Sequence, residues 1–186
     1  FVIMGGYLSF ALFNAGFHPL LTLPLAMILM FGFGWLVYVI IIRRVIDKDM
    51  FTSLLATFGL SLLMQQVINL IFGPEVQTVD PDFKIYSAFD DFVTIPSIKI
   101  LSLVLAALLA FGVVLFMKKS RLGQSIRATA QDPRAARVMG INTDRVYAIT
   151  FALNAAICGA AGVLVAMIWV IQPFYGIVYS IRSFAI

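Results

Sequence analysis

The sequence is poor in the residues that build most metal sites and catalytic sites. It contains one cysteine, Cys158, and one histidine, His18, among 186 residues. A single cysteine excludes a disulfide within the chain, and a single histidine with no partner at metal-binding spacing gives no zinc site. His18 lies outside the predicted membrane spans and Cys158 inside the last one. The chain therefore offers neither a Ser/His/Asp nor a Cys/His catalytic set. We therefore expect no metal, no cofactor and no enzymatic activity.

Charged residues are scarce as well, at 12%, whereas hydrophobic residues make up 62% of the chain and the mean hydropathy is +1.02. A soluble domain of this length would have to expose large apolar patches to water. The net charge is +4, and the lysine and arginine residues cluster beside hydrophobic runs, as membrane topology signals do. This placement disfavours a nucleic acid partner. The sequence also lacks the G-x-x-x-x-G-K-[ST] motif of P-loop ATP binding. The composition predicts a protein embedded in the lipid bilayer.

Hydrophobic runs divide the chain into membrane spans. A helix needs about twenty apolar residues to cross the hydrocarbon layer, and backbone groups in lipid must be paired within their own segment. We expect an all-α, polytopic transmembrane helix bundle, one permease-like domain over 1–186. Its spans are predicted at 1–13, 19–42, 51–72, 98–117 and 146–171. Because the start FVIMGGYLSF has no initiator Met or signal peptide, and the end SIRSFAI has no closing signal, we expect a segment of a longer chain.

The connections between spans differ in charge. Segments 43–50 and 118–145 hold most of the lysine and arginine residues, whereas 73–97 carries five acidic residues and one lysine. Lysine and arginine favour the cytoplasmic side, so the two basic connections are predicted to be cytoplasmic and 73–97 to lie outside. The runs DFKIYSAF and DFVTIPSI in the outer connection favour a short hairpin.

The basic connection 118–145 contains the signals of a short helix. Asp132 is a favoured N-cap, Pro133 suits the first helical position, and Gly140 can close the helix in a left-handed conformation. The pattern predicts a helix over 133–139 with Ala135, Val138 and Met139 toward one side. Such a helix is too short to be stable alone, so something must pack against it. The positive-inside rule explains the arginines, but it does not explain the caps or the length of the connection.

Polar side chains inside the predicted spans are candidates for contact with a passing solute. Gln65 and Asn69 share a helix face at i, i+4, and Asn154 lies in the last span. Polar groups at membrane depth usually turn toward the bundle interior; the alternative is that they hydrogen-bond neighbouring helices. The last span also carries small residues every four positions, from Ala148 to Ala160, which favours close helix packing.

Residues 123–164, GQSIRATAQDPRAARVMGINTDRVYAITFALNAAICGAAGVL, resemble the cytoplasmic loop and following helix of the branched-chain amino acid permeases, the Liv-type membrane subunits of bacterial ABC importers. LLATFGLSLLMQQ at 54–66, FGP at 72–74 and MGGYLSF at 4–10 are similar to the same family. The sequence departs from it at Asn154, where glycine is common.

The resemblance implies an inner-membrane subunit that moves amino acids, with branched-chain ones expected and other amino acids, urea or other small polar solutes as alternatives. Its partners would be a second permease subunit, two cytoplasmic ABC ATPase subunits that hydrolyse ATP, and an extracytoplasmic solute-binding protein. The capped helix would be the coupling helix that docks on the ATPase. The implied coupling residues are Arg127, Asp132, Pro133, Ala136, Gly140, Ile141, Asp144 and Arg145.

Three other functions remain open from the residues alone. They are an ion-coupled secondary carrier, a channel subunit and a membrane scaffold for other proteins. The absence of charged residues in mid-span disfavours a carrier, and the absence of ring-forming carbonyl or charge motifs disfavours a channel. Only an ABC importer requires a stoichiometric P-loop ATPase.

Overall fold

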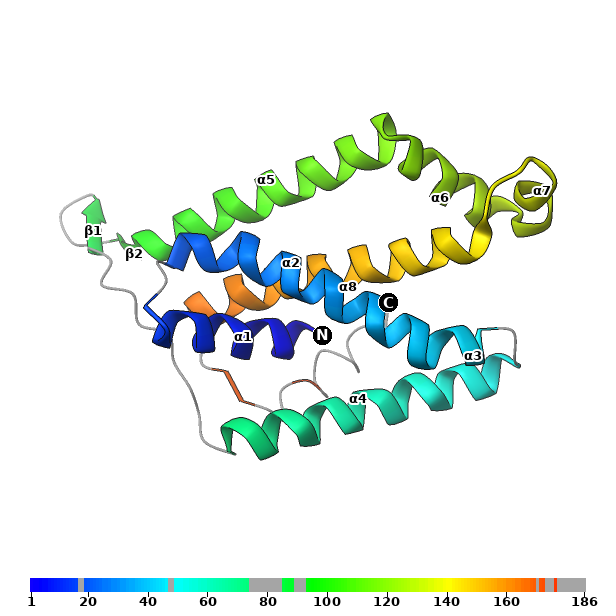
Figure 1. Cartoon of the computed structure of the whole chain (residues 1–186). Coiled ribbons are helices and arrows are strands. Elements are labelled where there is room, and N and C mark those ends of the chain that lie inside the picture. The colour runs from blue at the N-terminus through cyan, green and yellow to red at the C-terminus, as the bar shows by residue number, and fades with distance from the viewer. Residues whose placement is uncertain are drawn as a thin grey trace.

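The computed structural model describes residues 1–16, 19–46, 49–73, 85–88, 93–169, 171–172 and 176. Its long helices run roughly side by side along one direction (Figure 1), which confirms the predicted helical bundle. Four helical stretches are long and apolar enough to cross a membrane, and α1 is a shorter apolar helix. The long helices are α1 (Val2–Asn14), α2 (Pro19–Val37), α4 (Met50–Phe72), α5 (Ser97–Lys119) and α8 (Thr143–Ile168).

Local capping signals set several helix ends. Gly73 ends α4 with φ +78, and its N–H donates to the Asn69 carbonyl at 2.9 Å. Asn142 begins α8, because its side chain accepts from the Arg145 N–H at 3.1 Å. Two helices differ by two or three residues from the predicted spans: α5 continues to Lys119 instead of 117, and α8 runs from Thr143 to Ile168 instead of from 146 to 171. Polar residues can extend a helix beyond the apolar run that sequence reasoning measured.

Helices α1, α2 and α8 form the tightly packed centre of the bundle. A Cβ added to Gly5 of α1 would lie 2.6 Å from the Gly159 Cα of α8, and one added to Gly34 of α2 would lie 2.5 Å from the Ala155 Cβ. The predicted small-residue faces therefore do pack closely. Since lipid supplies no hydrophobic effect between helices, such backbone approach supplies much of their association.

Helices α4 and α5 flank this centre on opposite sides (Figure 1). Only 6% of the membrane-length stretch of each is buried, compared with 56% for α8. Their exposed side chains are largely apolar, including Phe58 and Leu70 on α4 and Leu103 and Phe111 on α5. In a bilayer these faces are compatible with contact to hydrocarbon chains, whereas in water they would be costly.

The helix predicted over 19–42 changes its hydrogen-bond pattern near its C-terminal end. It is α-helical to Val37, forms a π-helix η1 (Tyr38–Ile42), and continues as α3 (Arg43–Val45). Pro24 lies inside α2 without ending it. π-Helical turns are rare and frequently occur at functional sites, and the YVIII sequence gave no sign of this one.

The expected hairpin is present in the connection 73–97. Strand β1 (Ile85–Ala88) pairs antiparallel with β2 (Val93–Pro96), with Ile85 opposite Pro96 and Ala88 opposite Val93. Strand β2 leads directly into α5 at Ser97. The acidic residues predicted to mark this connection as extracytoplasmic, and the single histidine His18, lie outside the described residues.

Candidate functional site

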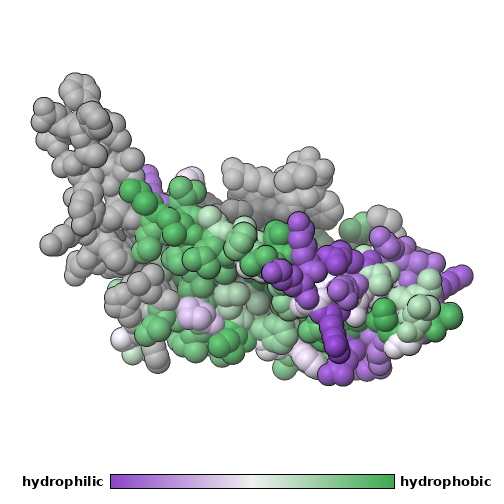
Figure 2. Space-filling model, turned by 90° about the horizontal axis from the view of Figure 1, so that it is seen from above, coloured by the Kyte–Doolittle hydropathy of each residue, from purple (hydrophilic) through white to green (hydrophobic). Residues whose placement is uncertain are grey.

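Most of the charged residues that the structure describes gather at one end of the bundle, around two further helices. These are α6 (Arg121–Gln131) and α7 (Pro133–Val138), which follow α5 and lie at the same end as α3 (Figure 1). Figure 2 shows this end as largely hydrophilic, beside a hydrophobic body. The sequence predicted α7 but gave no expectation of α6, which was missed. Its start signal was Ser120, an N-cap whose Oγ accepts from the Gly123 N–H at 2.9 Å.

Arg127 holds α6 against the end of α5. Its Nη1 donates to the Met117 carbonyl at 2.6 Å, which satisfies one of the carbonyls left unpaired where α5 ends. A Cβ added to Gly123 would lie 2.5 Å from the same carbonyl oxygen. Arg127 therefore bonds to the backbone of this chain, at the turn between α5 and α6. This turn determines the position of α7, which follows α6.

Both predicted caps of α7 are confirmed. The Asp132 Oδ1 accepts from the Arg134 N–H at 2.8 Å and the Ala135 N–H at 3.1 Å. Gly140 has φ +84, and its N–H donates to the Arg137 carbonyl at 3.0 Å. The Ile141 N–H donates to the Ala136 carbonyl at 3.0 Å, completing a Schellman motif. The helix ends at Val138, with Met139 as its C-cap, one residue earlier than predicted.

One side chain of α7 is buried and two large apolar ones are almost fully exposed. Ala136 is 4% exposed, whereas Val138 is 87% and Met139 81% exposed. The side expected to carry Ala135, Val138 and Met139 therefore packs on nothing within the described chain. Because polar groups surround this end, a pair of exposed apolar side chains there is typical of a protein contact.

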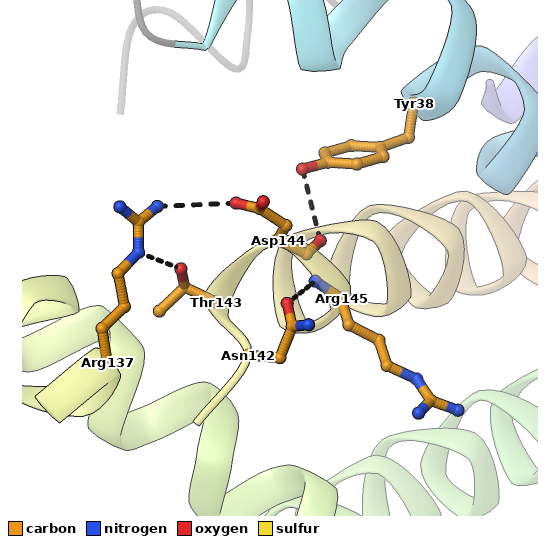
Figure 3. A network of polar contacts seen from close by, with 6 residues as sticks. All are labelled: Tyr38, Arg137, Asn142, Thr143, Asp144 and Arg145. Atoms are coloured by element: carbon orange, nitrogen blue, oxygen red, sulfur yellow. Dashed lines mark hydrogen bonds and ion pairs between the residues drawn. The ribbon is translucent and has the colours of Figure 1, made fainter. Parts of the chain in front are cut away.

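Arg137 connects α7 to the start of α8, and the start of α8 in turn contacts the π-turn (Figure 3). Its Nε donates to the Thr143 Oγ1 at 2.6 Å, and Thr143 is 2% exposed. Its Nη2 lies 3.5 Å from the Asp144 Oδ1. The Tyr38 Oη donates to the Asp144 carbonyl at 3.4 Å. These contacts bring α7, α8 and η1 together.

Sequence reasoning selected Asp144 and Arg145 but missed Arg137 and Tyr38. Asp144 belongs to the network, whereas the side chain of Arg145 points away from it (Figure 3). Arg137 lies six residues before Thr143 and seven before Asp144, across a predicted turn. This spacing was the available sign in the sequence that Arg137 could contact them. No local signal marked Tyr38, because its partner lies 106 residues away.

The Arg137–Thr143 bond is expected to hold α7 in place. Replacing Arg137 with alanine removes a charged hydrogen bond to a buried hydroxyl, worth about 1.5–3 kcal/mol, and an exposed ion pair worth little. Amide exchange over 133–140 should then be roughly tenfold faster or more, because about 1.4 kcal/mol corresponds to a factor of ten. Hydrogen–deuterium exchange of the purified protein measures this.

Arg134→Ala is the matched control, since the Arg134 guanidinium makes no hydrogen bond or ion pair among the described residues. It should leave the exchange of this segment unchanged. Equal exchange in the two variants would show that Arg137 does not hold α7.

The three polar residues expected along a solute pathway do not share one cavity. Gln65 lines a cavity of about 300 Å³ between α1, α4 and α8, and Asn69 lies one helical turn further along α4. Asn154 lines a different, apolar crevice of about 430 Å³ between α5 and α8. In the described part of the chain, no three His, Cys, Asp or Glu residues are grouped to hold a metal ion.

Comparison with known families assigns the chain. The family described as branched-chain amino acid transport system / permease component matches residues 1–186. The chain belongs to this family. Membership and the four membrane-length helices make it a multi-pass protein of the inner membrane. The family description names a permease component and not an enzyme.

Individual relatives carry related names. The chain is 29% identical to the high-affinity branched-chain amino acid transport system permease protein LivH of Salmonella typhimurium, over 98% of this chain and 59% of the relative. It is 27% identical to LivH of Escherichia coli K12, over 86% of this chain and 53% of the relative. With BraD of Pseudomonas aeruginosa it shares 29% identity over 98% of this chain and 64% of the relative. The chain thus spans less than two thirds of these relatives, and no solved structure matches it significantly.

Proposed function

We propose that this chain forms part of the membrane-spanning permease subunit of an ABC importer that moves amino acids, branched-chain ones first among them, into the cell. ATP is hydrolysed in two separate cytoplasmic ABC ATPase subunits. A second permease subunit and an extracytoplasmic solute-binding protein complete the transporter. The substrate is taken from the relatives, whose names specify branched-chain amino acid transport.

One observation supports this proposal most strongly, namely the position of α7. It is a capped two-turn helix at the polar end of the bundle, with Val138 and Met139 pointing into solvent. Nothing in the described chain needs these two side chains for packing. We infer that they insert into an apolar socket on the ATPase, so that α7 acts as the coupling helix.

The anchoring of α7 suits the transmission of force. Arg137 and Asp144 tie it to α8, and Tyr38 ties the same point to the π-turn that continues α2. Helices α2 and α8 pack closely in the centre of the bundle. A displacement of α7 by the ATPase would therefore act on both central helices. The ATPase can shift the inward–outward equilibrium only by the difference in its affinity for the two states.

A double substitution tests the docking surface. Val138→Asp with Met139→Asp places two charges where an apolar socket is proposed, and an unpaired charge buried in an interface costs several kcal/mol. We expect the variant permease to insert into the membrane normally but to lose the co-purifying P-loop ATPase in mild detergent.

Val138→Leu with Met139→Leu keeps the surface apolar and serves as the control, which should retain the ATPase. Full co-purification of the ATPase with the aspartate variant would show that α7 is not the docking element. Absence of an ATPase from the unmodified permease as well would favour the carrier, channel or scaffold functions.

A further inference from the structure

Helix α4 carries a row of polar side chains along most of its length. Thr57, Ser61, Gln65 and Asn69 recur every four residues, so they lie one above another on one helix face. Beside them runs an apolar row of Leu60, Met64 and Ile68. A membrane-spanning helix that faced only lipid would not place four hydrogen-bonding groups in register.

This face of α4 borders the 300 Å³ cavity described above. Thr57, Ser61 and Gln65 line it together with the apolar row of α4. The opposite wall includes Ile3 and Met4 of α1 and Phe151 of α8. The cavity volume is at the lower end of the roughly 300–1,000 Å³ typical of ligand pockets, so it suits a small molecule.

Two buried polar atoms continue the row toward the outer end of α4. The Tyr7 Oη and the Asn69 Oδ1 are both buried and have no hydrogen-bond partner among the residues that the structure describes. The Tyr7 ring lies 4.9 Å from the Phe72 ring, centroid to centroid, which places Tyr7 beside the last turn of α4. Buried polar atoms are nearly always paired, and an unpaired one in a native structure calls for a water or a ligand.

We propose that this polar row of α4, extended outward by Tyr7, is the wall along which the solute is bound and passed through the subunit. The inference rests on the proposed transport function and adds to it a binding site. Hydroxyl and amide groups bind the polar end of the solute in turn, and the parallel row of Leu60, Met64 and Ile68 contacts an apolar side group.

The chemistry of the cavity limits the solute to one without net charge. None of its lining side chains in the described part of the chain is Asp, Glu, Lys or Arg, and a net charge buried without a partner costs several kcal/mol. A zwitterion such as leucine satisfies both rows, because its opposite charges lie close together and its side chain is apolar. Lysine and glutamate should be bound much more weakly.

Labelling of cysteine variants tests the site without relying on transport. In a Cys158→Ser background, Ser61→Cys should react with a charged, membrane-impermeant methanethiosulfonate reagent, and leucine should slow the reaction whereas lysine should not. The neighbouring Leu62→Cys is the control. Both side chains are exposed in the described chain, but Ser61 lines the cavity and Leu62 does not, so lipid should exclude the reagent from position 62. Equal reactivity at the two positions, or no effect of leucine, would overturn the proposal.

Uptake by proteoliposomes that hold the complete transporter gives a second readout. We expect Gln65→Leu to raise the KM for leucine about tenfold or more, because a hydrogen bond to a charged group is lost. Gln66→Leu changes the adjacent, exposed glutamine and should leave KM unchanged. Equal KM values in the two variants would contradict the site.

The two proposals fail in different ways. If the complete unmodified transporter shows no ATP-dependent uptake of leucine but leucine still slows the labelling of Ser61→Cys, the transport function is wrong and the binding site on α4 stands. If uptake is normal and the labelling contrast is absent, the wall is wrong and the transport function stands.

Discussion

Replacing Gly140 with valine is expected to lower ATP-driven leucine uptake about tenfold or more while ATP hydrolysis continues. Gly140 has φ +84, a region that costs a β-branched residue about 1–2 kcal/mol or more. An added Cβ meets nothing within 4 Å, so the effect arises from the backbone and not from a clash. Relief of this strain breaks the hydrogen bonds of Gly140 and Ile141 that close α7. Uptake and hydrolysis measured in the same proteoliposomes give the coupling.

Two variants separate uncoupling from general damage. Gly140→Asn should keep much of the uptake, because asparagine tolerates positive φ. Gly16→Val imposes a similar strain at φ +88, also with no neighbour within 4 Å, but lies beyond the end of α1, far along the chain from α7. The Gly16→Val variant should keep leucine uptake coupled to ATP hydrolysis. Normal coupling in Gly140→Val would mean that the shape of α7 is irrelevant to transport.

Gly162→Ala should disrupt the bundle itself. The added methyl would collide with the Val2 carbonyl oxygen and lie 2.7 Å from the Gly6 nitrogen. These are backbone atoms, so they cannot rotate away, and α1 and α8 must separate. Overpacking of this kind costs about 1–3 kcal/mol or more. We expect a marked fall in the thermal midpoint and in the monodisperse fraction of the protein in detergent.

Gly112→Ala is the control on α5, where an added Cβ meets nothing within 4 Å. Alanine is favoured over glycine inside a helix by about 0.5–1 kcal/mol, so this variant should be as stable as the parent or slightly more so. An equally stable Gly162→Ala protein would show that α1 and α8 do not approach as closely as described.

The features predicted well from sequence are those with local causes. Asp132, Pro133 and Gly140 specify α7 within nine residues, and the structure contains the caps they indicate. The small-residue face of α8 was recognisable because helical spacing alone determines it. Helix α6 was missed because it has no apolar run to reveal it, although Ser120 already gave a start signal.

The features that were missed depend on contacts between distant segments. The π-turn at Tyr38 has no known sequence pattern, and its contact with Asp144 exists only once α2 and α8 have packed. Likewise, Gln65 and Asn154 are both polar residues in spans, yet only the fold shows that they line different cavities. The regular spacing of Thr57, Ser61, Gln65 and Asn69 was visible in the sequence, but its meaning required the cavity.

Site-specific cross-linking from α7 tests the central claim most directly. A photoreactive amino acid placed at position 138, in the native membrane, should form an adduct with a P-loop ATPase that mass spectrometry identifies. The same residue placed at position 103, on the exposed apolar face of α5, should form none with that ATPase. Cross-links from position 138 only to lipid or to other parts of the permease would contradict the account.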